Sequence, residues 1–184
     1  SNFWILSLGE FWGRLSFFGT LILLVLYTHK ELHLTDALSF SIYGVFISLS
    51  FALPLLGGVI ADKYLGYRNA MLFGLLLLVA GNLFLSNSHL WSFYLGLAFI
   101  NVGTGLYKPT CTAIVGHLYS GTNTQREQAY SIFYVLMNVG ATLGPLIYAA
   151  VVEAWGWHAG FIVSAIGLTC VALVFIVFFD QSKI

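Results

Sequence analysis

Six long apolar segments limit what this chain can fold into more than any other feature. They cover roughly residues 3–28, 37–61, 69–85, 91–119, 128–152 and 159–179. A helix needs about 20 apolar residues to cross about 30 Å of hydrocarbon, and only the third segment is at the short limit. None alternates polar and apolar residues as a barrel strand does, and a chain in lipid must satisfy its backbone internally. We therefore predict an all-α, polytopic membrane protein with six transmembrane helices.

The composition agrees with a protein that lies mainly in lipid. The 184 residues are 59% hydrophobic and 8% charged, whereas a soluble domain carries about 25% charged residues. The formal net charge is zero, so nothing indicates a nucleic-acid partner. Cys111 and Cys170 lie in separate apolar runs without CxxC spacing. We interpret both as small buried residues rather than as a disulfide or metal site, and we expect no metal.

The basic residues predict how the helices are oriented in the membrane. One side of the predicted bundle carries most of those near helix ends: Lys63, Arg68, Arg126 and Lys183. Lys30 falls on the other side. The positive-inside rule places the first group in the cytoplasm, and both termini with it. We expect an integral protein of the plasma (inner) membrane.

A short internal repeat predicts how the helices are grouped. In each copy a proline stands eight residues before an acid, and a glycine follows, at Pro54–Asp62–Gly66 and at Pro145–Glu153–Gly156. The two copies fall at the ends of the second and fifth segments, on opposite faces of the membrane. Two three-helix units of inverted topology would give this pattern, and transporters use that arrangement.

Three charged residues lie inside the predicted helices: Glu10, Arg14 and Lys108. Glu10 and Arg14 are four residues apart, so they share one helix face in the better order for an ion pair. A charge at a helix centre costs about 2.5–3.5 kcal/mol, so these groups should face a cavity or a partner. One acid and two bases leave an excess positive charge. The pattern favours a polar pathway that binds an anion such as a carboxylate. The alternative is a structural triad that only holds the helices together.

The segment around Lys108 contains features that shape its helix. Pro109 cannot donate a hydrogen bond to the carbonyl of Gly105, which predicts a kink next to the lysine. Gly103 and Gly105 would allow another backbone to approach closely.

Two motifs lie near the charged residues. The sequence EFWGRLSFFG begins at Glu10, and the sequence GTGLYKPTCTAIVGHLY covers residues 103–119. The first is similar to the first-helix signature ExxERFxYYG, and the second to the fourth helix, of the proton-dependent oligopeptide transporter family of the major facilitator superfamily.

Two further motifs extend the resemblance along the whole chain. The sequence GGVIADKYLGYR, residues 57–68, resembles the loop between the second and third helices of the superfamily. The sequence SIFYVLMNVGATLGPLI, from Ser131, resembles the fifth-helix signature FYxxINxGSL, from which Met137, Ala141 and Thr142 depart. Four motifs in order resemble the N-terminal six-helix half of such a transporter. They imply one half of a major facilitator fold with 3+3 inverted repeats, here over residues 1–184, without the C-terminal bundle.

The resemblance implies proton-coupled symport of di- and tripeptides by alternating access, driven by the proton gradient without a cofactor. Carried over by position, Arg14 and Lys108 would bind the carboxylate of the peptide. Asn138 would hydrogen-bond the peptide, and Glu10 would belong to the proton-coupling network. The alternative for Asn138 is a hydrogen bond between helices.

Other positions receive roles from the same resemblance. Tyr134 and Tyr43 are candidates for substrate binding, with ordinary packing as the alternative. Asp62, Gly66 and Arg68 fit the cytoplasmic charge relay that holds one access state in the superfamily.

The first-helix motif departs from the family in three places. Gly13 stands where the second acid of ExxER is expected, and Phe17 and Phe18 replace a pair of tyrosines. Gly9 and Gly13 form a GxxxG spacing, so Gly13 could serve close helix packing. Otherwise proton coupling is altered, lost or carried by Glu10 alone. In the last case an arriving carboxylate would take the two bases, and Glu10 would then accept a proton.

The sequence leaves alternatives open. The expected partners are a small peptide or another carboxylate-bearing substrate, protons, the lipid bilayer and a missing C-terminal six-helix half. A carrier of another organic anion or modified peptide would fit the excess positive charge. A non-transporting membrane receptor or assembly subunit is an alternative of another class. An intramembrane enzyme is disfavoured, since neither GxSxG nor HExxH occurs.

Overall fold

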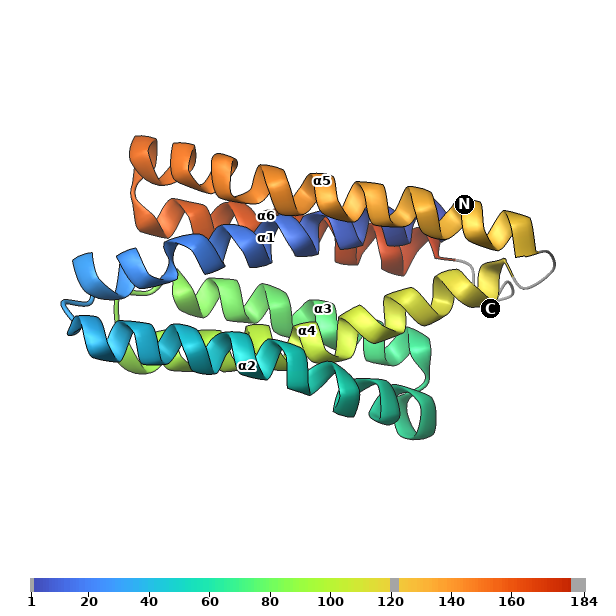
Figure 1. The fold of residues 1–184 in the computed structure, drawn as a ribbon, viewed down its shortest axis with the longest axis horizontal. Coiled ribbons are helices and arrows are strands. Elements are labelled where there is room, and N and C mark those ends of the chain that lie inside the picture. Colours follow the sequence, from blue (N-terminus) through green and yellow to red (C-terminus); the bar gives the residue numbers. More distant parts are fainter. Residues whose placement is uncertain (1, 120–122, 180–184) are drawn as a thin grey trace.

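The computed structural model describes residues 2–119 and 123–179, which form one bundle of six long helices (Figure 1). The helices are α1 (Asn2–Lys30), α2 (Asp36–Ile60), α3 (Tyr67–Leu85), α4 (Leu90–Leu118), α5 (Asn123–Trp155) and α6 (Trp157–Phe178). A turn of π-helix, Ala61–Leu65, continues α2. All six helices are long and apolar enough to cross a membrane. The described residues contain no strand, so the predicted all-α membrane fold is confirmed.

The helix ends lie close to the sequence boundaries except in α5. This helix begins at Asn123 and ends at Trp155, whereas the apolar run suggested 128–152. Residues 123–128 are polar and exposed, and Gln, Arg and Glu among them are good helix formers. Hydropathy shows where an apolar run ends, but a helix can continue past that point into water. Lys183, which was used to predict the orientation, lies outside the described residues.

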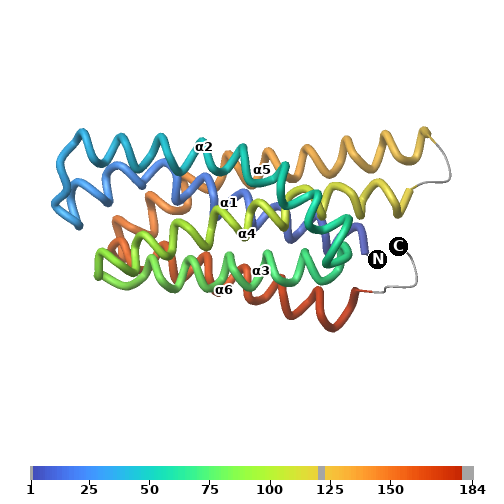
Figure 2. Tube along the Cα trace, turned by 90° about the horizontal axis from the view of Figure 1, so that it is seen from below, coloured from blue at the N-terminus to red at the C-terminus, as the bar shows by residue number. Residues whose placement is uncertain are grey.

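The helices pack as two related three-helix units. The main neighbours are α3 with α4, α1 with α5, α2 with α4, α3 with α6 and α1 with α6. If the first three helices are exchanged with the last three, the α1–α5 pair becomes α4–α2. The α3–α4 pair becomes α6–α1 in the same way. Figure 2 shows α2 and α5 along one side of the bundle and α3 and α6 along the other. The contact pattern is therefore that of an inverted repeat.

The two glycines of the sequence repeat occupy the same structural position in each unit. Gly66 joins the π-helical end of α2 to α3, and Gly156 joins α5 to α6. Their φ angles are +74° and +87°, in the region that glycine adopts at little cost and that strains other residues. The short repeat thus marks the turn between the second and third helices of each unit.

The described basic residues near helix ends separate to the two ends of the bundle, whereas Arg14 and Lys108 lie inside it. Helix α1 begins and α6 ends at the same end, as Figure 1 shows. Lys63 and Arg68 lie at the junction of α2 and α3, and Arg126 lies in the first turn of α5, at this end. Lys30 closes α1 at the opposite end. The chain topology therefore agrees with the grouping from which the orientation was predicted.

Helices α2 and α4 make a close backbone contact near Pro109. Helix α4 continues through this proline and bends in its C-terminal part (Figure 1). The carbonyl of Gly105, which Pro109 deprives of its usual donor, packs directly against Gly57 of α2. Gly103 packs in the same way against Gly74 of α3. The expected close approach at Gly103 and Gly105 is therefore present, on two different faces of α4.

Burial differs strongly between the helices. In the most apolar window of α2 and of α5, 22% of the residues are buried inside the bundle, compared with 44–56% for the other helices.

Cys111 of α4 is buried, but Cys170 of α6 is exposed, so the interpretation of Cys170 as buried was wrong. In a membrane protein an apolar run is compatible with either lipid contact or protein contact. Composition alone does not separate the two.

We expect Gly57→Ala to destabilise the fold. A Cβ at this position would overlap the Gly105 carbonyl oxygen, which is backbone and cannot rotate away, so α2 and α4 would have to separate. Overpacking of this kind costs about 1–3 kcal/mol. Thermal unfolding of the full-length protein in detergent checks this, with Gly44→Ala as the control, since a Cβ at Gly44 meets nothing within 4 Å. Equal melting temperatures for the two variants would contradict the contact.

Candidate functional site

The three intramembrane charges meet at one cavity between α1, α2 and α4. The cavity has a volume of about 70 Å³, and Glu10, Arg14 and Lys108 all line it. Phe17 and Phe18 of α1 line it as well, so the rings that replace the family's tyrosines face the same space. The sequence prediction that these charges face a cavity rather than lipid agrees with this geometry.

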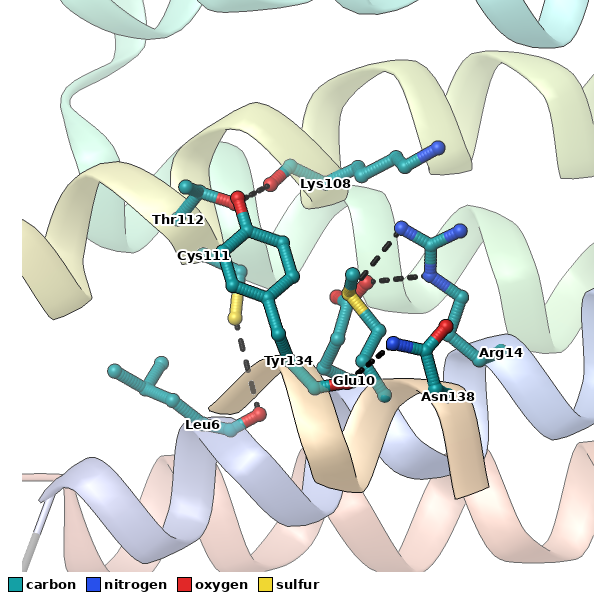
Figure 3. Close-up of polar contacts among 9 residues, drawn as sticks. Leu6, Glu10, Arg14, Lys108, Cys111, Thr112, Tyr134 and Asn138 are labelled. Atoms are coloured by element: carbon teal, nitrogen blue, oxygen red, sulfur yellow. Dashed lines mark hydrogen bonds and ion pairs between the residues drawn. The ribbon is translucent and has the colours of Figure 1, made fainter. Parts of the chain in front are cut away.

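Glu10 and Arg14 form an ion pair on α1. Arg14 Nε donates to Glu10 Oε1 over 2.9 Å (Figure 3), and the whole Glu10 residue is 3% exposed. A second nitrogen of the guanidinium donates to the sulfur of Met137 on α5 over 3.2 Å. A thioether is a weak acceptor, so Arg14 retains capacity for a stronger one.

Lys108 approaches the pair from α4 without an ion-pair partner of its own. Its ammonium lies 5.9 Å from the centre of the Phe51 ring, a weak cation–π contact. Among residues 2–119 and 123–179, no carboxylate lies within ion-pair distance of it. Lys108 interacts at longer range with both Glu10 and Arg14. Figure 3 shows its side chain extending along α4 on the side where Arg14 rises from α1.

The site as a whole therefore carries an excess positive charge. Glu10 balances Arg14, and the Lys108 ammonium remains. Arginine can bind a carboxylate with two parallel hydrogen bonds, and lysine adds a compact charge with three donors. An anion that entered between α1 and α4 would find donors from both helices. The arrangement is suited to binding a carboxylate in competition with Glu10.

Tyr107 is the main feature of the site that sequence reasoning did not identify. It is 2% exposed and lines the same cavity, with its ring packed along Gly9 and Gly13 of α1. A Cβ at Gly9 would collide with the Tyr107 hydroxyl, whereas a Cβ at Gly13 would lie at an ordinary 3.7 Å from the ring. Close helix packing thus explains Gly9 but does not require a glycine at position 13.

The sequence contains a partial signal for the missed residues. Thr104 and Tyr107 precede Lys108 by four and one positions on α4, so a helical projection centred on the lysine includes them. Ser50 and Phe51 of α2 also line the cavity. Their presence depends on how far α2 slides along α4, and no local pattern sets that register.

The candidates on α5 face the site but do not line the cavity. Tyr134 is 47% exposed, and Asn138 is also exposed. The amide nitrogen of Asn138 donates to the carbonyl of Tyr134 over 2.8 Å, within its own helix. Figure 3 shows both side chains on the face of α5 that carries Met137 toward Arg14.

Tyr43 lies apart from the other candidates. It is half-buried on α2 and packs against the apolar core of the bundle. It is not among the residues that line the charged cavity.

The candidate relay residues lie at the end of the bundle where α1 begins. Gly66 makes the turn with positive φ between the π-helical turn and α3. The exposed carboxylate of Asp62 lies close to the side chain of Tyr67, and Arg68 follows in the first turn of α3. Their role in holding an access state stays a prediction.

A second, more apolar hollow lies between the N-terminal halves of α2 and α4. Its volume is about 350 Å³, and its lining includes Ile42, Phe46, Tyr94 and Leu97 with the amide of Asn101.

Within the described part of the chain, no group of three or more His, Cys, Asp or Glu residues is placed to hold a metal ion.

Comparison with known proteins assigns the chain to a family. Residues 6–183 match the model of the Major Facilitator Superfamily. The chain is 33% identical to the peptide transporter YePEPT of Yersinia enterocolitica, over 92% of this chain and 35% of that protein. It is 31% identical to dipeptide and tripeptide permease A of Chromobacterium violaceum, over 95% of this chain and 36% of that protein. The chain thus spans about a third of the length of these relatives.

Solved structures give the same assignment. The crystal structure of a POT family transporter in complex with 5-aminolevulinic acid superposes with a TM-score of 0.89 at 31% identity, covering 96% of this chain and 37% of that one. The match covers nearly the whole chain, and the family-like motifs on α1, α4 and α5 lie at the cavity or on the helix face beside it. The chain therefore belongs to the major facilitator superfamily and, within it, to the proton-dependent oligopeptide transporter family that its motifs indicate.

Proposed function

We propose that this chain is the carboxylate-binding and proton-binding half of a symporter for di- and tripeptides. The observation that carries the proposal is the cavity in which one acid faces two bases from two helices. The substrate carboxylate binds between Arg14 and Lys108. Asn138 and Tyr134 contact the peptide from α5. No cofactor takes part, and the proton gradient supplies the driving force.

The names of the relatives support a peptide as the substrate. YePEPT is described as a peptide transporter, and the Chromobacterium violaceum relative as a dipeptide and tripeptide permease. The chain spans about a third of each of them, so the amino end of the peptide is assigned to a second six-helix bundle. Movement of the two bundles about the site gives alternating access, with Asp62, Gly66 and Arg68 holding one of the two states.

Coupling follows from competition for Arg14. In the empty site the Glu10 carboxylate is held by the guanidinium at 2.9 Å. A substrate carboxylate that takes the guanidinium leaves Glu10 as an unpaired buried anion. Such an anion is costly, and protonation removes the cost. Binding of the peptide and uptake of one proton by Glu10 are linked in this way, without a second acid at position 13.

The membrane and the orientation are proposed from the charge distribution. Lys63, Arg68 and Arg126 lie at the end of the bundle where α1 begins, and the positive-inside rule places that end in the cytoplasm. The plasma (inner) membrane follows from import driven by an external proton excess.

A second candidate substrate class is a small organic anion with a carboxylate. A related POT family transporter was crystallised with 5-aminolevulinic acid, and the excess positive charge of the site does not require a peptide bond. Competition between dialanine and such an acid for uptake separates the two classes.

The proposed function is tested by uptake of labelled dialanine into liposomes that contain the full-length protein. We expect concentrative uptake when the outside is acidic and only equilibration without a gradient, because each peptide carries a proton bound at Glu10. Uptake that does not change with the gradient would agree with the peptide site but would contradict the coupling. No peptide flux in either condition would contradict the peptide assignment.

Replacement of Glu10 by glutamine should separate binding from coupling. Glu10→Gln keeps the shape and removes the titrating group, so peptide exchange between equal pools should persist while accumulation driven by the gradient is lost. The matched control is Glu153→Gln, which replaces an exposed acid at the end of α5. This variant should accumulate peptide like the unsubstituted protein. If Glu10→Gln retains the pH dependence of the parent, Glu10 is not the coupling group.

A further inference from the structure

Tyr107 carries a buried polar atom that the proposed function does not use. The residue is 2% exposed, and its hydroxyl has no hydrogen-bond partner of good geometry among the described residues. The nearby thiol of Cys111 is directed to the carbonyl of Leu6, 3.8 Å away. A buried hydroxyl without a partner is destabilising. Its position beside the charged cavity points to a partner in another state of the site.

The Tyr107 hydroxyl comes from α4 and packs against the turn of α1 that carries Glu10. Gly9 provides the space for it, since a Cβ at Gly9 would overlap the Tyr107 oxygen. Glu10 is the next residue along the chain, and both Glu10 and Tyr107 line the cavity. A cavity of about 70 Å³ has room for a water molecule, which occupies about 30 Å³ in the liquid. A water molecule in this cavity would bridge the Glu10 carboxyl and the hydroxyl where the two do not meet directly.

The other groups around Glu10 limit what a protonated carboxyl can bind. The titratable and charged neighbours are Arg14 of α1 and Tyr107, Lys108 and Cys111 of α4. The α2 side is formed by Ser50 and Phe51, and α6 meets this turn through Val171. Met137 and Tyr134 stand on the α5 side. Arg14 and Lys108 are donors only, so neither can accept the proton of a carboxylic acid.

A protonated Glu10 consequently needs an acceptor oxygen, and the family's second acid is absent at Gly13. We propose that the Tyr107 hydroxyl is this acceptor and positions the protonated Glu10 during transport. The inference rests on the proposed function, because it assumes that a substrate carboxylate displaces Glu10 from Arg14. Tyr107 acts through Glu10 and does not itself carry the transported proton.

The proton balance of this step is simple. When the substrate carboxylate takes the guanidinium of Arg14, Glu10 accepts one proton from the aqueous phase with the higher proton concentration. The new O–H donates to the Tyr107 oxygen, directly or through the water. When the substrate leaves on the other side, Arg14 pairs with Glu10 again and the proton is released to that aqueous phase.

The experiment compares Tyr107→Phe with Tyr148→Phe in the full-length protein. Each change removes a buried hydroxyl without a hydrogen bond of good geometry among the described residues and keeps the ring, but Tyr148 does not line the charged cavity. Loss of a hydrogen bond to the protonated carboxyl should move the midpoint of the pH profile of dialanine uptake by about 0.5–1 unit toward acid. This corresponds to a three- to tenfold loss in proton affinity. Peptide exchange between equal pools should be retained, and Tyr148→Phe should leave the midpoint unchanged.

An infrared measurement tests the same bond without transport. On acid titration of the protein, the carboxylic C=O band that disappears in Glu10→Gln belongs to Glu10. We expect this band to move to higher frequency in Tyr107→Phe, as for a carboxyl with a weaker hydrogen bond, and to stay in place in Tyr148→Phe.

The outcomes separate this inference from the proposed function. If the parent protein moves no peptide, the proposed function fails, and the infrared band still decides whether Tyr107 binds the protonated Glu10. If uptake is proton-coupled but Tyr107→Phe changes neither the midpoint nor the band, the hydroxyl is only packed there and the inference is wrong. A shift in Thr104→Val instead of Tyr107→Phe would assign the acceptor to the other α4 hydroxyl at the cavity and overturn the proposal.

Discussion

The ion pair between Glu10 and Arg14, with Lys108 unpaired across the cavity, is the interaction on which the site depends. Taking charges out of water is costly, and mutual attraction offsets this cost only where geometry and hydrogen bonding are good. Here the pair is short and shielded. Lys108, which approaches it from α4, has no carboxylate within ion-pair distance among the described residues. A site built only for stability would be expected to balance its charges. The uncompensated lysine is the reason to assign the cavity to a ligand.

The cavity that places Lys108 opposite this pair forms where the helices approach closely at glycines. Gly57 lets the carbonyl of Gly105 pack against α2, and Gly9 lets Tyr107 of α4 lie against α1. These contacts bring α1, α2 and α4 together around one cavity. They also set the level along α1 at which Lys108 faces Glu10. The cavity sits on the side where α2 and α5 flank the centre, and these two helices bury the smallest share of their apolar windows. The second six-helix bundle that we propose would pack against that side.

Much of this was accessible from the sequence because it depends on local periodicity. The spacing of Glu10 and Arg14 fixes a shared helix face whatever surrounds it, and six apolar runs fix six crossings. The turns at Gly66 and Gly156 were visible as a repeat. Other features depend on how one helix is placed along another, which no local pattern encodes. Tyr107, Ser50 and Phe51 reach the cavity through that register.

The differences between prediction and structure have the same origin. Apolar runs gave the membrane-embedded part of α5, but its helix continues through polar residues into water. Cys170 was assigned to the interior because apolar character does not distinguish lipid from protein surroundings. Tyr43 lies on the helix that supplies Phe51 to the cavity, yet it packs into the core of the bundle instead. Family motifs indicated which residue types to expect, and the packing decided which of them reach the charged cavity.

The central claim is that Arg14 and Lys108 bind the carboxylate of the substrate, and the most direct test compares dialanine with dialanine amide. The two molecules differ only in the group that the bases would bind. Competition against labelled dialanine for exchange across liposomes gives their relative affinities for the full-length protein. A charge-assisted hydrogen bond contributes about 1.5–3 kcal/mol, so the amide should compete about tenfold or more weakly. Equal competition by the amide would show that the bases do not recognise a carboxylate and would contradict the account.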